Sequence, residues 1–219
     1  MQVTILDATS YPLTTIGTNA SYCYNTQLKD INHARRIAEH CIKSGHGRNL
    51  EFADITLKIT CSARCAREFY THIGGAPTRV QASTRYITYD NFKYFIPKFP
   101  VPELMEDYCD VMEVIREFYN KMKQYGTEND VTGYVLPLAM ETTFVWKGNV
   151  RTLENMFNQR LCLRALDEYR QLMLQIKAKI YDELDNEWEW INNNLFVSKC
   201  AKAGYCTENN KKCVLYRER

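Results

Sequence analysis

The sequence predicts a single α+β domain in which an antiparallel or mixed sheet is flanked by long helices. Residues 52–61 alternate apolar and polar side chains, which is the pattern of a strand with one buried face. Two long segments, 103–124 and 152–190, carry apolar side chains at helical spacing instead. No linker rich in proline, glycine or serine divides the chain. We therefore assign one domain to residues 1–191 and a cysteine-containing tail to residues 192–219.

The N-terminal part is predicted to contain a strand, a loop and a helix. Residues 1–6 alternate like a strand, and Pro12 and Gly17 then predict a loop. An apolar stripe predicts a helix over residues 31–43, and Asp30 stands where its N-cap belongs.

The middle of the chain alternates between regular and irregular patterns. Residues 62–70 fit a short helix, which must end before Gly74, Gly75 and Pro77. The aromatic-rich residues 86–99 suggest short strand pieces and turns, and residues 141–146 suggest a strand.

Composition limits the possible classes of function. The chain has 219 residues and a net charge of +2, which is too small to indicate binding to nucleic acid or to an acidic membrane surface. No window is apolar enough to span a bilayer, and no export signal precedes the first strand. Nine cysteines without such a signal favour a reducing, cytoplasmic location over a disulfide framework.

The loop that follows the short central helix holds an unusual set of donors. Two guanidiniums, an amide and an imidazole stand close together in the sequence around two glycines, and these donors are Arg79, Arg85, Gln81 and His72. Arginines bind oxyanions through two parallel hydrogen bonds, and glycines let backbone N–H groups approach a ligand. The segment therefore fits a phosphorylated ligand, although an ordinary polar turn has the same composition.

Three cysteines in the tail, Cys200, Cys206 and Cys213, leave three alternatives open. Zinc favours thiolates, and Cys61 and Cys65 would complete a site, but the spacings are not those of short zinc knuckles. A disulfide and plain thiols are the other two possibilities. We assign no metal from the sequence.

Four stretches occur in an order and spacing that point to a known family. They are the histidine-to-glutamate segment 45–51, the Ser-x-Arg-Tyr segment 83–86, the Leu-Pro turn within 133–137, and the run of asparagines and arginines from 149 to 170. Together they resemble the flavin-dependent thymidylate synthases over roughly residues 1–190.

The resemblance implies methylation of dUMP, a pyrimidine deoxynucleotide, at C5. The implied carbon donor is methylenetetrahydrofolate, the implied hydride donor is reduced FAD, and NADPH reloads the flavin. It also implies a homotetramer with active sites shared between subunits.

The resemblance assigns roles to individual residues of this chain. Arg160 is implied as the catalytic residue that holds the pyrimidine oxygen. The expected substrate-binding residues are Ser83, Thr84, Arg85, Arg79, Glu68 and Arg160. The expected cofactor-binding residues are His72, Ile73, Gln81, His46, Arg48, Asn149, Arg151 and Asn155.

The chain departs from the family pattern at several positions. Thr71-His72-Ile73 replaces Arg-His-Arg, Gly133 replaces an arginine, and Glu68 replaces a glutamine. We expect Arg79 to supply part of the lost positive charge. Two alternatives follow from the departures: a related C5 modification such as hydroxymethylation of another pyrimidine nucleotide, or a relative that binds nucleotide or flavin without turnover.

Overall fold

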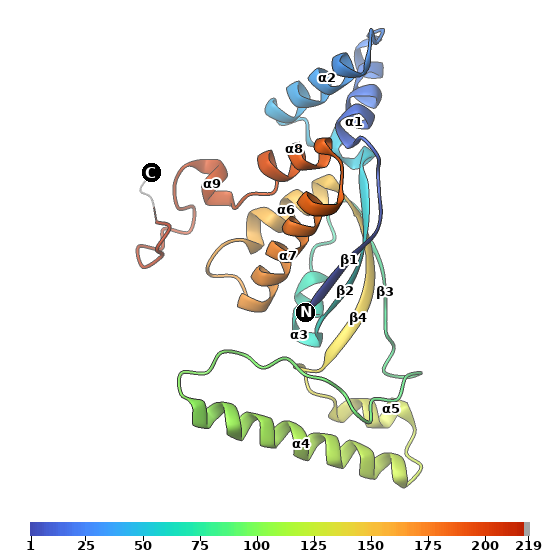
Figure 1. Cartoon of the computed structure of the whole chain (residues 1–219), viewed down its shortest axis with the longest axis vertical. Coiled ribbons are helices and arrows are strands. Elements are labelled where there is room, and N and C mark those ends of the chain that lie inside the picture. Colours follow the sequence, from blue (N-terminus) through green and yellow to red (C-terminus); the bar gives the residue numbers. More distant parts are fainter. Residues whose placement is uncertain (217–219) are drawn as a thin grey trace.

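The computed structural model describes residues 1–216 and is built on a four-stranded antiparallel sheet. The strand order is β1-β2-β4-β3, with a bulge in β1 between Ile5 and Asp7. The strands are β1 (Gln2–Ala8), β2 (Asp54–Ser62), β3 (Thr78–Gln81) and β4 (Glu141–Asn149). Helices α3 (Ala63–Phe69), α6 (Val150–Arg160), α7 (Asp167–Glu183) and α8 (Asn186–Asn194) lie on one side of the sheet (Figure 1). The predicted α+β architecture is confirmed.

The core lies between this sheet and its helices. The alternation predicted for 52–61 places Ile55, Leu57 and Ile59 inward, where each is at most 1% exposed. Lys58 and Lys147 point to the opposite, open face. Each buried apolar side chain contributes about 1.5–3 kcal/mol relative to exposure, so this alternation fixes which face the helices cover.

Helices α1 (Pro12–Ser21) and α2 (Ile31–Lys43) form a pair at one end of the molecule (Figure 1). Helix α2 has the predicted bounds, and the Asp30 carboxylate caps it by accepting a hydrogen bond from the His33 N–H at 2.7 Å. The loop predicted around Pro12 and Gly17 is wrong. Proline suits the first helical turn, where no N–H donor is needed, and a Cβ at Gly17 would lie 1.8 Å from the Ala34 carbonyl oxygen of α2.

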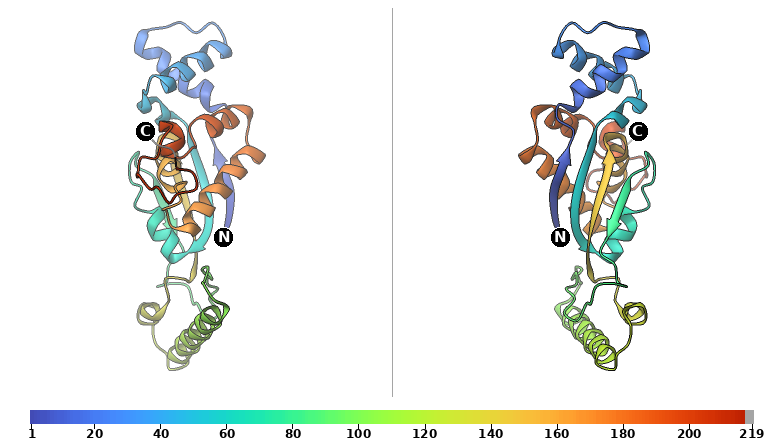
Figure 2. Two further views of the ribbon diagram at one scale, coloured as in Figure 1. Left: turned by 90° about the vertical axis from the view of Figure 1, so that its left-hand side faces the viewer. Right: turned by 90° about the vertical axis from the view of Figure 1, so that its right-hand side faces the viewer.

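Residues 82–140 form a lobe beyond the other end of the sheet (Figures 1 and 2). The lobe contains α4 (Pro102–Gln124) and α5 (Asn129–Thr132), followed by the 3-10 turn η3 (Gly133–Val135). The expected strand pieces over 86–99 are mostly turns, with an isolated bridge between Tyr94 and Met140. The 3-10 turns η1 (Tyr22–Tyr24) and η2 (Gly47–Phe52) connect the elements before β2.

The single helical region predicted over 152–190 is three helices, α6, α7 and α8. Asp185 caps α8 by accepting from two backbone N–H groups, which starts a new helix after the break at Leu184. The core continues past residue 191, because Phe196 is fully buried and stacks on Phe157 with ring centroids 4.5 Å apart. The tail then adds α9 (Lys199–Ala203). Among the described residues, no helix combines the length and apolar character that crossing a membrane requires.

Candidate active site

Arg160, the last residue of α6, is the centre of a polar group at the junction of α3, α6 and α7. Its Nε–H donates to Nε2 of His72 at 3.0 Å, and its Nη1 lies 3.3 Å from Oε2 of Glu68. Its guanidinium also lies over the ring of Tyr169, 5.0 Å from the centroid. The Arg160 side chain is only 20% exposed, so these contacts hold the cation in a fixed position.

His72 is held in its neutral form. Burial and then the nearby Arg160 guanidinium lower its pKa to about 4, against a weaker opposing effect of Glu68. Since Nε2 accepts a hydrogen from Arg160, the ring proton sits on Nδ1. The imidazole therefore orients the guanidinium without adding a second positive charge.

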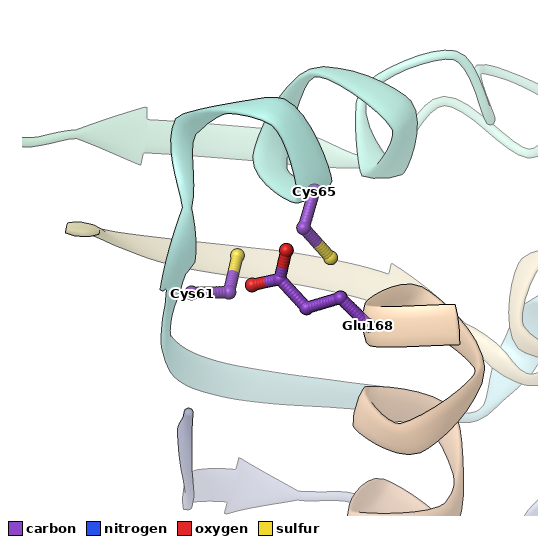
Figure 3. Close-up of side chains that lie close together, drawn as sticks. All are labelled: Cys61, Cys65 and Glu168. Atoms are coloured by element: carbon purple, nitrogen blue, oxygen red, sulfur yellow. The ribbon is translucent and has the colours of Figure 1, made fainter. Parts of the chain in front are cut away.

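A buried cluster of Cys61, Cys65 and Glu168 lies at the adjoining start of α3 (Figure 3). The Glu168 carboxylate accepts the Ser62 N–H at 2.8 Å and the Ser62 hydroxyl at 2.5 Å. The same hydroxyl oxygen accepts the Cys65 N–H and so caps α3. Hydrogen bonding with Cys61 and then burial raise the pKa of Cys65, which keeps that thiol protonated.

This cluster fixes the frame behind Arg160. Glu168 ties the end of β2 to the first turn of α7, so α3, which carries Glu68, and α7, which carries Tyr169, are held together. The three ligand atoms lie within 4.8 Å of one another, but the carboxylate is already hydrogen-bonded. Cys61 and Cys65 do not line the cavity that Cys200, Cys206 and Cys213 share, so the structure gives no support to the alternative in which they complete a zinc site with the tail.

The glycine loop after α3 is fastened to the start of α6. The Asn149 Oδ1 accepts the Thr152 N–H at 3.0 Å, and its Nδ2 donates to the Gly75 carbonyl at 3.1 Å. The Thr152 hydroxyl donates to the Gly74 carbonyl at 2.6 Å. Gly75 has a φ of +82°, and a Cβ there would lie 2.3 Å from that hydroxyl, so only glycine fits. Asn149 thus caps α6 and holds the loop, whatever it does toward a cofactor.

A positively charged edge lies where η2 meets α6. Arg151 pairs with Glu51 at 2.5 Å, and Arg48 lies 4.0 Å from the other oxygen of the same carboxylate. Two guanidiniums share one carboxylate, so the group keeps a charge of +1 that an anion can use. His46 precedes this turn and is exposed. The sequence did not predict the pairing of Arg151 with Glu51, because the two residues are 100 positions apart.

The expected phosphate contacts lie within the lobe formed by residues 82–140. The Ser83 Oγ accepts the Arg85 N–H at 3.2 Å, and the Arg85 guanidinium pairs with Asp130 at 2.8 Å, with both charged groups exposed. Thr84 stands beside Gly133, since a Cβ on that glycine would lie 3.6 Å from the Thr84 Oγ1. Gly133, where the resemblance expects an arginine, is therefore adjacent to the Ser83–Arg85 turn, and a Cβ there would make only ordinary contacts.

Strand β3, which falls in the segment expected to be a loop, places Arg79 and Gln81 at the sheet edge. The Arg79 guanidinium stacks 4.0 Å from the Tyr70 ring centroid, and the Gln81 amide bridges the Tyr70 hydroxyl and Thr142. Ile73 is 74% exposed in the preceding loop. All four residues of β3, Thr78–Gln81, are exposed. Their sequence therefore lacks the alternation of apolar and polar residues that predicts a strand.

The fold brings some of the expected residues together and leaves others apart. Glu68 and His72 meet Arg160, and Asn155 lines a cavity beside the tail that Arg160 also lines. No hydrogen bond or ion pair within residues 1–216 joins Arg85 to the Arg160 group. The sequence did not reveal two partners: Tyr169, which had the pattern of a core position, and Asp130, which had that of a surface residue.

Comparison with known proteins identifies the family. The family model described as thymidylate synthase complementing protein matches residues 4–184. The chain belongs to this family. The resemblance stated from the sequence is thereby confirmed, and its motifs fall on the elements described above.

Individual relatives and a solved structure agree with this assignment. A flavin-dependent thymidylate synthase of Pyrococcus furiosus is 28% identical over 229 residues, covering 96% of this chain and 91% of the relative. One of Thermotoga neapolitana is 28% identical over 172 residues, covering 75% and 78%. The crystal structure of the flavin-dependent thymidylate synthase ThyX from Helicobacter pylori, complexed with FAD and dUMP, matches with a TM-score of 0.71. It shares 18% identity and covers 89% of this chain and 99% of that one. The last comparison confirms the fold.

Proposed function

We propose that this chain is a flavin-dependent thymidylate synthase that methylates dUMP at C5. The observation that carries the proposal is the Arg160 group, a partly buried guanidinium held by His72 and Glu68 in a chain of this family. In this reaction, methylenetetrahydrofolate donates the carbon, and the methylene unit must gain a hydride to become a methyl group. The C5 proton of dUMP leaves, and NADPH is the final source of the hydride.

Arg160 supports this chemistry through charge. Before C5 attacks the one-carbon unit the pyrimidine must become electron-rich, and the negative charge of this activated ring lies largely on its oxygens, where a guanidinium stabilises it. A guanidinium has five N–H donors, and its contacts to His72 and Glu68 leave others for a substrate oxygen. Because His72 is neutral, the positive charge stays concentrated on Arg160.

The residues of the η2–α6 edge fit an anionic dinucleotide cofactor. Arg48 and Arg151 share the single carboxylate of Glu51, so one positive charge is left to pair with an anion. These two arginines would hold the FAD pyrophosphate, with His46 beside them. Thr71 and Ile73 bring no charge to the position where the family has two arginines. When bound, FAD supplies the hydride that completes the methyl group.

The nucleotide phosphate is expected at the Ser83–Arg85 turn. A nucleotide monophosphate needs charged donors to replace its hydration, and Arg85 already pairs with Asp130. Arg79 has no acidic partner among the described residues and stacks on Tyr70 instead. We therefore retain Arg79 as the cation that replaces one of the lost guanidiniums at the substrate or flavin phosphate.

The homotetramer is proposed on the exposure of α4. Only Met112 and Tyr119 of its 23 residues are buried, whereas Val114 and Phe118 are 63% and 52% exposed. An amphipathic helix with an uncovered apolar face is stabilised by packing against another surface. In a family whose subunits share active sites, the surface that covers this face of α4 is expected to be the same lobe of a second copy of the chain. A cytoplasmic location remains a prediction.

Absorption spectroscopy tests the cofactor assignment directly. The purified chain, supplied with excess FAD and then desalted, should retain close to one flavin per chain and show a flavin spectrum. The variant Arg151→Ala should lose flavin, and exposed Arg67→Ala on α3 should keep it. A wild-type chain that remains colourless would contradict the flavoenzyme proposal and favour a nucleotide-binding relative.

A further inference from the structure

Four of the nine cysteines gather around one cavity between α6 and the tail. The cavity has a volume of about 730 Å³. Cys162 lines it from the loop after α6, Cys200 from α9, and Cys206 and Cys213 from the last described turns. The sequence placed three of these thiols near one another. The fold adds the fourth from a position 38 residues before Cys200.

The tail has no core of its own to hold it there. No residue described in the segment 199–216 is buried, and α9 has only five residues. The contacts to the body include ion pairs of Lys202 with Glu154 and of Arg164 with Glu208, the latter at 3.2 Å. Exposed ion pairs contribute about 0–1 kcal/mol each, and short segments without a core usually depend on a cross-link or a metal.

Polar groups lie beside two of the four sulfur atoms. The Asn210 N–H donates to Sγ of Cys206 at 3.4 Å, and the Asn210 carbonyl accepts the Cys213 N–H at 3.0 Å, so one residue holds both cysteines on the same wall. The Ser198 hydroxyl lies 3.2 Å from Sγ of Cys200. Hydrogen bonds of this kind orient sulfur ligands around a metal.

The charge around the cavity favours a metal over disulfides. Four cations line it, Arg160, Arg164, Lys199 and Lys202, against the anions Glu154 and Glu208; because Arg160 is also paired with Glu68, the net charge is +1. Four thiolates around Zn²⁺ carry a net charge of −2, which this rim would partly offset. Two disulfides are neutral and gain nothing from it.

We propose that Cys162, Cys200, Cys206 and Cys213 bind one zinc ion as four thiolates. Four sulfur ligands in a tetrahedral arrangement are typical of structural zinc, and binding releases the four thiol protons to solvent. Within the described structure, no three of these sulfurs lie within 4.8 Å of one another. Zinc binding therefore draws the tail inward over the cavity. It also fixes the loop after α6, since Cys162 follows Arg160 by two residues.

Metal analysis of the full chain tests this proposal without reference to catalysis. The protein is purified under reducing conditions without chelators, and its zinc content is measured before and after incubation with one equivalent of zinc. The expected value is close to one zinc per chain. Serine at Cys162, Cys200, Cys206 or Cys213 should abolish retention, whereas Cys23→Ser and Cys109→Ser should not. Since the four cysteines are only partly buried, the variants should keep the wild-type circular dichroism and remain interpretable.

Cobalt substitution gives a second measurement on the same protein. Co²⁺ bound by four thiolates has intense visible absorption, which should appear in the wild type and weaken or shift in each of the four variants. A wild-type chain that takes up no zinc, or mass spectrometry that finds these cysteines paired as disulfides under reducing purification, would overturn the proposal. Retention of zinc in all four serine variants would do the same.

Discussion

Replacing Arg160 by alanine should separate catalysis from stability. The guanidinium is 20% exposed and is aimed by His72 and Glu68, so it acts on the developing charge of the pyrimidine in a site partly shielded from water. Removing one such preorganised donor costs about 2.7–4 kcal/mol of transition-state stabilisation, or about 10²–10³ in kcat.

The stability loss should be much smaller. Glu68 is 39% exposed, so its ion pair with Arg160 contributes about 0–1 kcal/mol. The contact with the Tyr169 ring adds about 0.5–1 kcal/mol. Together they predict a fall in Tm of roughly 1–8 °C for a chain of this size.

The assay is the rate of dTMP formation at saturating substrates, with flavin content and Tm measured on the same samples. Arg67→Ala serves as the matched control, because it removes an exposed guanidinium from neighbouring α3. The reasoning fails if Arg160→Ala keeps more than a tenth of the wild-type turnover, or if both variants lose activity equally.

Further predictions concern pH, phosphate binding and assembly. The pKa of His72, about 4 in the folded chain, lies below its ordinary value of 6.5. The contribution of neutral His72 to the free energy of unfolding is therefore fully present above pH 6.5 and is lost as the pH falls toward 4. Urea unfolding should show this decline in the wild type and a weaker one in His72→Gln, and identical pH profiles would refute the assignment. Arg79→Ala should weaken dUMP binding by about tenfold or more in calorimetry, the loss of one charge-assisted contact. Adding Gly133→Arg should restore part of this affinity, and unchanged binding in Arg79→Ala would reject the compensation. Light scattering should find a tetramer for the wild type and smaller species for Phe118→Asp, whereas a monomeric wild type would contradict the shared-site arrangement.

Local patterns predicted the elements whose signals are local. The apolar stripe and the Asp30 cap predicted α2 with its observed bounds, and alternation predicted β2 because one face of the sheet is buried. The sequence did not predict α1, because Pro12 was interpreted as a loop signal although proline also begins helices. It also gave no sign of β3, a four-residue edge strand without a buried position.

The site was harder to predict because its contacts are distant in the sequence. The resemblance assigned Arg160 to the substrate and His72 to the cofactor, and no local pattern could show that Arg160 donates to His72 across 88 residues. The meeting of Cys162 with the tail thiols likewise depends on how α6 ends and where α9 packs. Spacing along the chain carries no information about such packing, since it is set by the whole core.

The most direct test of the proposed function is product formation by the purified chain. The protein is incubated with FAD, dUMP, methylenetetrahydrofolate and NADPH, and the nucleotides are separated and identified by mass spectrometry, with each component omitted in turn. The account predicts dTMP that appears only in the complete mixture and disappears in Arg160→Ala. If flavin-loaded protein gives no dTMP, or gives a hydroxymethylated nucleotide instead, the assignment as a thymidylate synthase is contradicted.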